Sequence, residues 1–169
     1  MLDAGSLAAI EGAIVRADLA AANQWQDTTD DTGRYTLTLP VGTYTVNAEA
    51  FGYLSDTVSA VAVETNAVTT HDFYLLPIPE YVVSGTVVEV GTGIPLRAEV
   101  QVLGTPLAPA TTDPLTGFYS TTVPVGSYVF RATAPGHKGE ERLVVVDHDQ
   151  TQSFMLSPIR FYLPVVLGD

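Results

Sequence analysis

One phrase occurs twice in the chain. The stretch DTGRYTLTLPVGTYTVNAEAFGY covers residues 31–53, and TGFYSTTVPVGSYVFRATAPGH covers residues 116–137. Four matched pairs stand 84 positions apart, namely Gly33 and Gly117, Pro40 and Pro124, Gly42 and Gly126, and Tyr44 and Tyr128. A period this long indicates tandem domains and not the short units of a solenoid. We therefore predict two units, each of about 80 residues and able to bury one small core.

The repeat also predicts the domain boundaries. FYLLP at 73–77 corresponds to FMLSP at 154–158, 81 positions later, so the units end at equivalent points. We expect a first sandwich over residues 1–78, a second over 79–158 and a strand-like tail over 159–169. The connection LLPIPE is short and contains two prolines, which predicts a stiff link and a rod with limited bending.

Side chains alternate between apolar and polar in both copies, with a period of two. The inward positions are expected to be Tyr35, Leu37, Leu39, Tyr44, Val46, Ala48 and Ala50 in the first copy and Tyr119, Thr121, Val123, Tyr128, Phe130, Ala132 and Ala134 in the second. This alternation predicts half-buried antiparallel strands. Proline can close a strand, and Gly42 and Gly126 could take a positive φ in a short loop, so each copy is predicted to be a hairpin.

Other strands are expected where β-branched and aromatic residues are enriched. They cover 12–18, 24–28, 54–63 and 67–76 in the first unit, and 81–90, 97–104, 107–112, 140–146 and 150–157 in the second. Short strands separated by regular turn signals predict an all-β protein, built as two tandem Greek-key β-sandwiches.

Composition excludes several classes of partner. Seven Lys and Arg against 19 Asp and Glu give a net charge of −12, which repels the phosphates of nucleic acids and of anionic membranes. No apolar run approaches the roughly 20 residues that a membrane-spanning helix needs. The chain has no cysteine, which excludes disulfides and thiolate metal sites. The first ten residues lack the pattern of a secretion signal, so no export signal is expected within this chain; removal of an earlier signal is the alternative.

The second copy resembles a known family. Gly-x-Val at 85–87, GTGIPLRAEVQV at 91–102 and the phrase at 116–137 resemble the carboxypeptidase regulatory-like domain. The resemblance covers residues 80–157 fully and 7–77 partly. It implies a transthyretin-like (prealbumin-like) sandwich. In this family such modules are mostly non-catalytic attachments of secreted peptidases, surface proteins and outer-membrane receptors, where they act as spacers or as folding and interaction domains.

One strand of the second unit has no counterpart in the first. Aligning residues 8–17 with 93–102 puts the partner of strand 81–90 before Met1, so the first unit is expected to lack its opening strand. Either the chain is a fragment or another strand fills the gap. The apolar tail could add a strand, through residues 159–167, to a sheet edge in this chain or in a neighbour, or it could pack across the domain interface.

Two acidic turns are weak candidates for a calcium site. They contain Asp27, Asp30 and Asp31 in one stretch and Asp147 and Asp149 in the other. Carboxylate oxygens suit calcium, but neither stretch has the spacing of a known calcium loop. Aspartate beside glycine is also common in ordinary turns, so no metal and no cofactor are expected.

The chain is not expected to be an enzyme. His71, His137 and His148 fall in a strand, a loop and a turn that are not predicted to meet, and no Gly-x-Ser-x-Gly elbow is present. A Lys–Asn isopeptide bond within either unit is excluded, because the first unit has no lysine and the second has no asparagine.

Sugar binding is the main alternative. Trp25, the only tryptophan, and Tyr53 are expected near strand ends, where an exposed ring could stack on a sugar. Burial of Trp25 in the core or over a sheet edge is the competing interpretation. The sequence therefore predicts a non-catalytic accessory, spacer or protein-interaction segment of a larger secreted or cell-surface bacterial protein associated with a peptidase, with a carbohydrate-binding module as the alternative.

Overall fold

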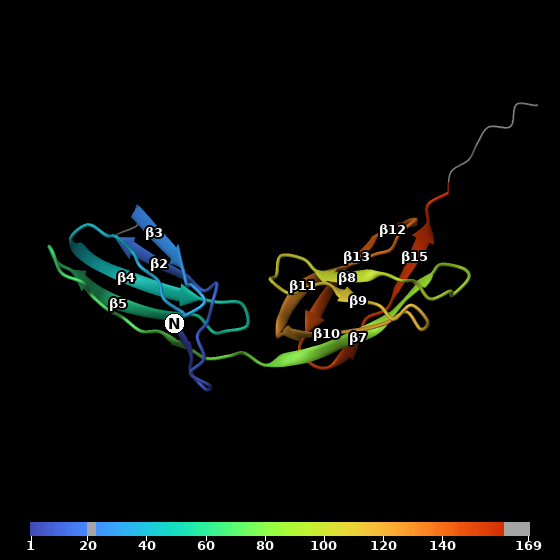
Figure 1. The fold of residues 1–169 in the computed structure, drawn as a ribbon, viewed down its shortest axis with the longest axis horizontal. Coiled ribbons are helices and arrows are strands. Elements are labelled where there is room, and N and C mark those ends of the chain that lie inside the picture. The colour runs from blue at the N-terminus through green and yellow to red at the C-terminus, as the bar shows by residue number, and fades with distance from the viewer. Residues whose placement is uncertain (20–22, 161–169) are drawn as a thin grey trace, which may run out of the picture. The chain divides into compact units, whose positions relative to one another are not determined.

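The computed structural model of the protein describes residues 1–19 and 23–160 (Figure 1). The chain divides into two compact units, Met1–Pro79 and Glu80–Asp169. Every regular element in the described ranges is a β-strand, which confirms the predicted all-β class. Within these ranges there is no helix long and apolar enough to cross a membrane.

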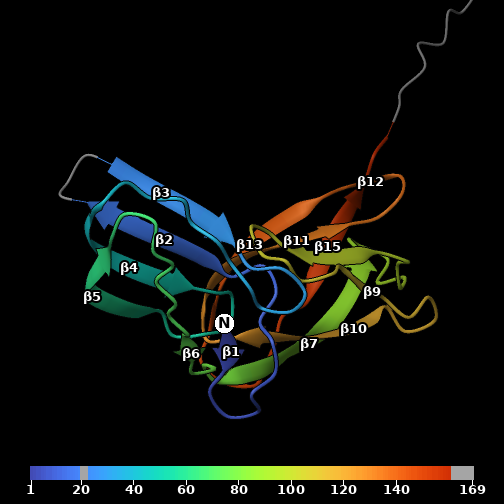
Figure 2. The same ribbon diagram turned by 60° about the vertical axis from the view of Figure 1, so that its left-hand side comes forward.

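The first unit contains one four-stranded sheet and a two-stranded parallel pair. The strands are β1 (Leu2–Asp3), β2 (Ile14–Leu19), β3 (Asn23–Thr28), β4 (Gly42–Glu49), β5 (Asp56–Val63) and β6 (Tyr74–Leu75). The larger sheet has the order β3-β2-β4-β5, and β1 lies beside β6 (Figure 2). Alternate residues of β2 and β4 pack on Phe73 and Leu75 from the β6 segment, and together they form the core of this unit.

The second unit is a fuller sandwich. Its strands are β7 (Glu80–Glu89), β8 (Glu99–Val102), β9 (Ala110–Thr111), β10 (Phe118–Pro124), β11 (Gly126–Thr133), β12 (His137–Lys138), β13 (Glu140–Val146), β14 (Gln150–Thr151) and β15 (Phe154–Pro158). One sheet has the order β10-β7-β15-β12, with β14 also paired to β7, and the other has the order β13-β11-β8-β9. Val83, Val87, Phe130 and Phe154 are fully buried between them.

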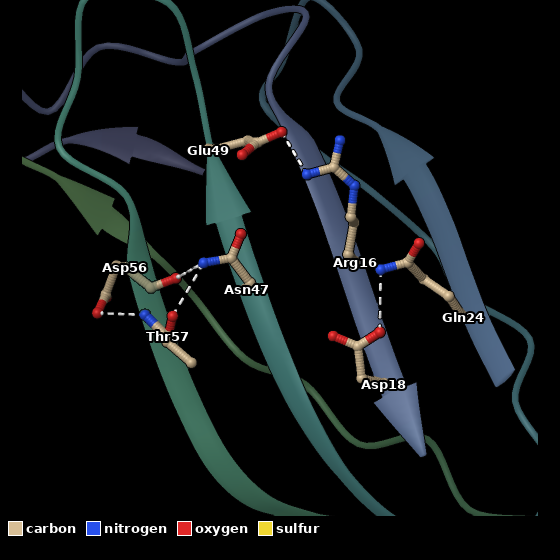
Figure 3. Close-up of polar contacts among 7 residues, drawn as sticks. All are labelled: Arg16, Asp18, Gln24, Asn47, Glu49, Asp56 and Thr57. Carbon is tan, nitrogen blue, oxygen red and sulfur yellow. Dashed lines mark hydrogen bonds and ion pairs between the residues drawn. The ribbon is translucent and has the colours of Figure 1, made fainter. Parts of the chain in front are cut away.

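The alternation of faces is confirmed in β4 and β11. Tyr44, Val46 and Ala48 are buried, and the residues between them point outward. Figure 3 shows the outer face of the first sheet, where polar side chains bond to one another across the strands. Arg16 pairs with Glu49, the Gln24 amide donates to Asp18 at 3.0 Å, and the Asn47 amide donates to Thr57 at 2.9 Å.

The predicted hairpins are wrong. β10 pairs with β7, whereas β11 pairs with β13 and β8, so in the second unit the repeated phrase crosses from one sheet to the other. Positive φ angles occur at Gly33 (75°) and Gly117 (71°), not at Gly42 or Gly126. The absence of a side chain at Gly126 leaves room for the Tyr128 ring, since a Cβ there would lie 2.8 Å from the Tyr128 phenol oxygen. Alternation reveals which residues are buried, but it does not reveal which sheet they belong to.

The strand predicted over 35–39 is also wrong, because these residues have no regular structure. The 67–76 strand is reduced to Tyr74–Leu75. In the second unit, β10 pairs with β7 along its whole length. In the first unit, the place that corresponds to β7 contains only β1, and β1 pairs with β6 alone among the described strands. A sequence with strand propensity has formed no strand here, where it has no partner strand among the described residues.

Candidate functional site

The acidic turns bind their own backbone. Asp30 Oδ1 accepts hydrogen bonds from Thr32 N at 2.9 Å, Thr32 Oγ1 at 2.7 Å and Arg34 N at 2.9 Å. The Thr32 side chain and the Arg34 backbone are the main reasons why the pKa of Asp30 lies below its ordinary value. This carboxylate therefore closes a turn that ends in the positive-φ Gly33.

The other candidate aspartates lie in similar surroundings. Asp27 Oδ2 accepts from Thr36 N at 2.6 Å, Asp149 Oδ1 accepts from Val82 N at 2.8 Å, and Asp147 contacts His148. Asp31 is exposed in the same turn as Asp30. Among residues 1–19 and 23–160, no group of three His, Asp or Glu side chains is arranged to bind a metal ion.

The three histidines lie in different surroundings. The His71 ring lies 4.6 Å from the Phe73 ring in an edge-to-face contact. His137 is bonded through Nε2 to Glu89 Oε2 at 3.0 Å and through Nδ1 to Pro135 O at 2.9 Å. The bond to Pro135 and then the bond to Glu89 raise the pKa of His137, and His137 lowers the pKa of Glu89. His148 is exposed beside Asp147.

The two aromatic candidates for sugar stacking both pack on the first core. Trp25 is half-buried and meets Tyr44 edge to face, with the ring centroids 5.7 Å apart. Tyr53 is also half-buried, and its hydroxyl is among the groups that bond to the Asp3 carboxylate. The rings therefore contribute part of their surface to the stability of the first unit.

Three duplicated polar contacts are absent from the sequence-based prediction. Asp113 Oδ1 accepts from Leu115 N and Thr116 N, both at 2.9 Å, and so repeats the Asp30 turn. Buried Thr29 bonds to the backbone of the loop that precedes β2, and buried Thr112 bonds to the backbone of the loop that precedes β8. The Glu89–His137 pair occupies the place of Asp3 and Tyr53. The sequence contained a signal for the first of these contacts, because an aspartate precedes the turn glycine in each copy. The second turn is one residue longer, so the two aspartates are 83 positions apart and a comparison at the fixed offset of 84 does not align them.

The first unit contains an open groove. Residues 32–41 line one side and 63–72 line the other, with Met1 and Leu2 at one end, around a cavity of about 990 Å³. Tyr35, Leu37 and Leu39 are half-buried along the first side. The Tyr35 hydroxyl crosses to His71 O at 2.9 Å and ties the two sides together.

Along both sides of this groove, few backbone groups have a hydrogen-bond partner among the described residues. Among the described residues, the backbone of 35–39 makes one hydrogen bond, from Thr36 N to Asp27. Over 68–72 the described contacts of the backbone are limited to His71 O, which accepts from Tyr35. An apolar groove with free backbone groups is suited to binding an extended peptide.

Part of the chain matches a known protein family. Residues 2–76 match the family described as the carboxypeptidase regulatory-like domain. This match covers most of the first unit, which is therefore similar to a carboxypeptidase regulatory-like domain. The family model therefore matches the first unit, although the motifs of the sequence indicate only a partial resemblance there and a full one in the second unit. Bacillopeptidase F of Bacillus subtilis (strain 168) is 35% identical over 133 residues, which is 78% of this chain but 9% of that protein. The chain therefore spans a small part of the length of this relative.

Similar solved structures were found at low sequence identity. GBS52, the minor pilin of Streptococcus agalactiae, has a TM-score of 0.47 at 14% identity over 95% of this chain and 88% of its own. The streptococcal ancillary pilin has a TM-score of 0.45 at 15% identity over 94% and 60%. The Bacillus anthracis TIE protein has a TM-score of 0.42 at 17% identity over 94% and 33%.

Proposed function

We propose that the protein is a non-catalytic accessory and spacer segment of a larger secreted or cell-surface bacterial protein associated with a peptidase. The observation that carries this proposal is the family match over residues 2–76, together with the similarity to a stretch that makes up 9% of Bacillopeptidase F. In this proposal the segment binds other domains of its parent protein or a protein partner through its sheet edges.

The second unit is proposed to be a second copy of the same transthyretin-like domain. Equivalent contacts recur in both units and support this. Tyr35 donates to His71 O, and Tyr119 donates to Gln152 O at 2.6 Å. The Met1 amino group donates to Gly33 O at 2.6 Å, and Val87 N donates to Gly117 O at 2.9 Å.

The junction between the units supports a spacer role. Ile78 N donates to Gly52 O within the first unit at 2.9 Å. Glu80 is already the first residue of β7, paired with Pro124 within the second unit. A single residue, Pro79, lies between these two anchored positions, and its ring fixes φ. Such a connection favours a defined separation of the domains on either side.

A measurement of distances between the units tests this proposal. The chain has no cysteine, so Ser59→Cys and Thr133→Cys introduce two unique spin-label sites on exposed strand positions, one in each unit. Pulsed electron-paramagnetic-resonance spectroscopy of the doubly labelled full chain should give one narrow distance distribution. The matched control inserts six Gly and Ser residues between Pro79 and Glu80 and should broaden the distribution, because such linkers behave as flexible coils. Equal, broad distributions in both proteins would reject the spacer role.

Two finer predictions have no observation in their favour beyond the sequence. A carbohydrate-binding role requires Trp25 and Tyr53 to be exposed together, and both are half-buried. Strand exchange through 159–167 concerns a tail of which 161–169 lie outside the described residues. Both remain predictions.

A further inference from the structure

Near its last described strand, each unit contains the same small arrangement. In the first unit, Tyr53 forms an antiparallel bridge with Pro77, and Ile78 N donates to Gly52 O at 2.9 Å. The Tyr53 hydroxyl is among the groups that bond to the carboxylate of Asp3 in β1. We call these five residues the first clasp, because they fasten the segment after β6 to a turn and, through that turn, to another strand.

The second clasp has the same connections in the second unit. His137 pairs with Pro158, so β12 lies beside the end of β15 (Figure 1), and Ile159 N donates to Gly136 O at 2.8 Å. His137 also bonds to the carboxylate of Glu89, the last residue of β7. The side chains of His137 and Glu89 are only 12% and 23% exposed. The two clasps therefore differ in the group that meets the carboxylate, a phenol in the first and an imidazole in the second.

The imidazole of the second clasp has an acceptor at each of its two nitrogens. Nδ1 of His137 lies 2.9 Å from Pro135 O, and Nε2 lies 3.0 Å from Glu89 Oε2. A carbonyl oxygen and an ionised carboxylate only accept hydrogen bonds, and a neutral imidazole has a single N–H. Both bonds can therefore exist together only while His137 is protonated. The bond to Pro135 and then the bond to Glu89 raise the pKa of His137, in agreement with this geometry.

The charged and polar groups around this pair keep the carboxylate ionised. His137 itself has the largest effect in lowering the pKa of Glu89, and the Thr92 hydroxyl, which donates to Glu89 Oε1 at 2.9 Å, has the next largest. The positive charge of Arg160 acts in the same direction. Lys138, beside His137 in β12, is exposed. Near neutral pH, His137 is therefore the member of the pair that changes its charge.

We propose that the second clasp is operated by a proton on His137, so that it holds the end of β15 while the imidazole is cationic and loosens when the imidazole becomes neutral. Loss of the proton removes one of the two bonds that fix the ring. The end of β15 then loses support, because Pro158 pairs with His137 and Ile159 N bonds to the adjacent Gly136. The first clasp lacks this response, since a phenol ordinarily keeps its proton up to about pH 10.

Hydrogen exchange at two backbone amides of the full chain tests the proposal. The amides of Ile159 and Ile78 report on the second and the first clasp, and NMR spectroscopy gives their protection factors at pH 5.5 and pH 8. Ile159 should lose at least about fivefold in protection at the higher pH, the factor that corresponds to about one hydrogen bond, whereas Ile78 should not change. Over the same range, the ¹⁵N shifts of the His137 ring should change from those of an imidazolium to those of a neutral imidazole.

Two variants assign the effect to the imidazole of the second clasp. His137→Tyr copies the first clasp and should keep Ile159 protected at both pH values. The matched control His148→Tyr replaces an exposed histidine outside the clasp and should leave the pH dependence at Ile159 unchanged.

Three outcomes would overturn the proposal. They are constant protection of Ile159 while the His137 ring titrates, a pH dependence that persists in His137→Tyr, and ring nitrogen shifts of a neutral imidazole at pH 5.5. The first and third are read from the unmodified protein, so they do not require a variant to fold. None of these outcomes depends on the distance distribution that tests the spacer role.

Discussion

The segments 34–40 and 118–124 have nearly the same pattern but different structures. Residues 118–124 form the strand β10, which pairs with β7 at every position. Residues 34–40 keep the same inward side chains but form no strand, because only the two residues of β1 occupy the place of β7. The comparison teaches that a strand depends on its partner as much as on its own propensity. The following predictions test how far the two units are equivalent.

The largest effect is expected from Gly85→Val, which affects the second unit only. The new side chain would meet Gln152 O, and the predicted loss is at least about 3 kcal/mol of unfolding free energy. Trp25 lies in the first unit, so its fluorescence reports urea unfolding of that unit alone, and circular dichroism reports both. The tryptophan transition should stay unchanged. A shift in that transition would show that the two units do not unfold independently.

The next prediction is a loss of unfolding free energy that should be equal in both units. Thr29 Oγ1 donates to Ile10 O at 2.7 Å and accepts from Ala13 N at 2.9 Å, and Thr112 Oγ1 makes the matching bonds to Leu96 O and from Ala98 N, both at 2.7 Å. Replacing either buried threonine with isosteric valine leaves two backbone groups without partners and should cost about 2 kcal/mol. Denaturant melts of Thr29→Val and Thr112→Val provide the comparison. Losses of unfolding free energy that differ more than twofold between the two variants would contradict the structural equivalence of Thr29 and Thr112.

A smaller loss of unfolding free energy is expected from removing a tyrosine hydroxyl, and it should differ between the two units. Burial raises the pKa of both Tyr35 and Tyr119 above 10, but only Tyr119 is fully buried. Tyr119→Phe should cost about 1 to 1.5 kcal/mol, and Tyr35→Phe less than about 1 kcal/mol, because water can reach the open groove. Urea melts measure both. Equal costs would indicate that the groove is already filled in the protein as purified.

The smallest effect is a pH dependence confined to the second unit. The raised pKa of His137 adds stability that is complete below its ordinary value of 6.5 and lost as the pH rises through the raised value. The lowered pKa of Glu89 adds stability present above 4.5 and lost as the pH falls. The stability difference between the wild type and His137→Gln should therefore be larger at pH 5.5 than at pH 8. Tyr53 occupies the equivalent place in the first unit, so Tyr53→Phe should show no such difference between these two pH values.

The sequence predicts the two units and their buried faces, because alternation and a fixed offset are local properties. The hairpins could not be recognised as crossings between sheets, since Pro124 and Gly126 fit either connection. The missing strand at 35–39 depends on a partner that no pattern within 31–53 contains. Likewise, the aspartates suggest calcium by residue type alone, and only the geometry shows that Asp30 is saturated by Thr32 and Arg34.

The parallel pairing of β7 with β15 has a mechanical consequence. The second unit begins at Glu80 with β7 and leaves its last described strand at Pro158, and these strands run side by side in the same direction. A tension applied to the two ends of this unit therefore pulls the neighbouring strands past each other. The slanted hydrogen bonds between them are loaded together in shear and not peeled apart one at a time. This arrangement resists extension of the second unit along its strands.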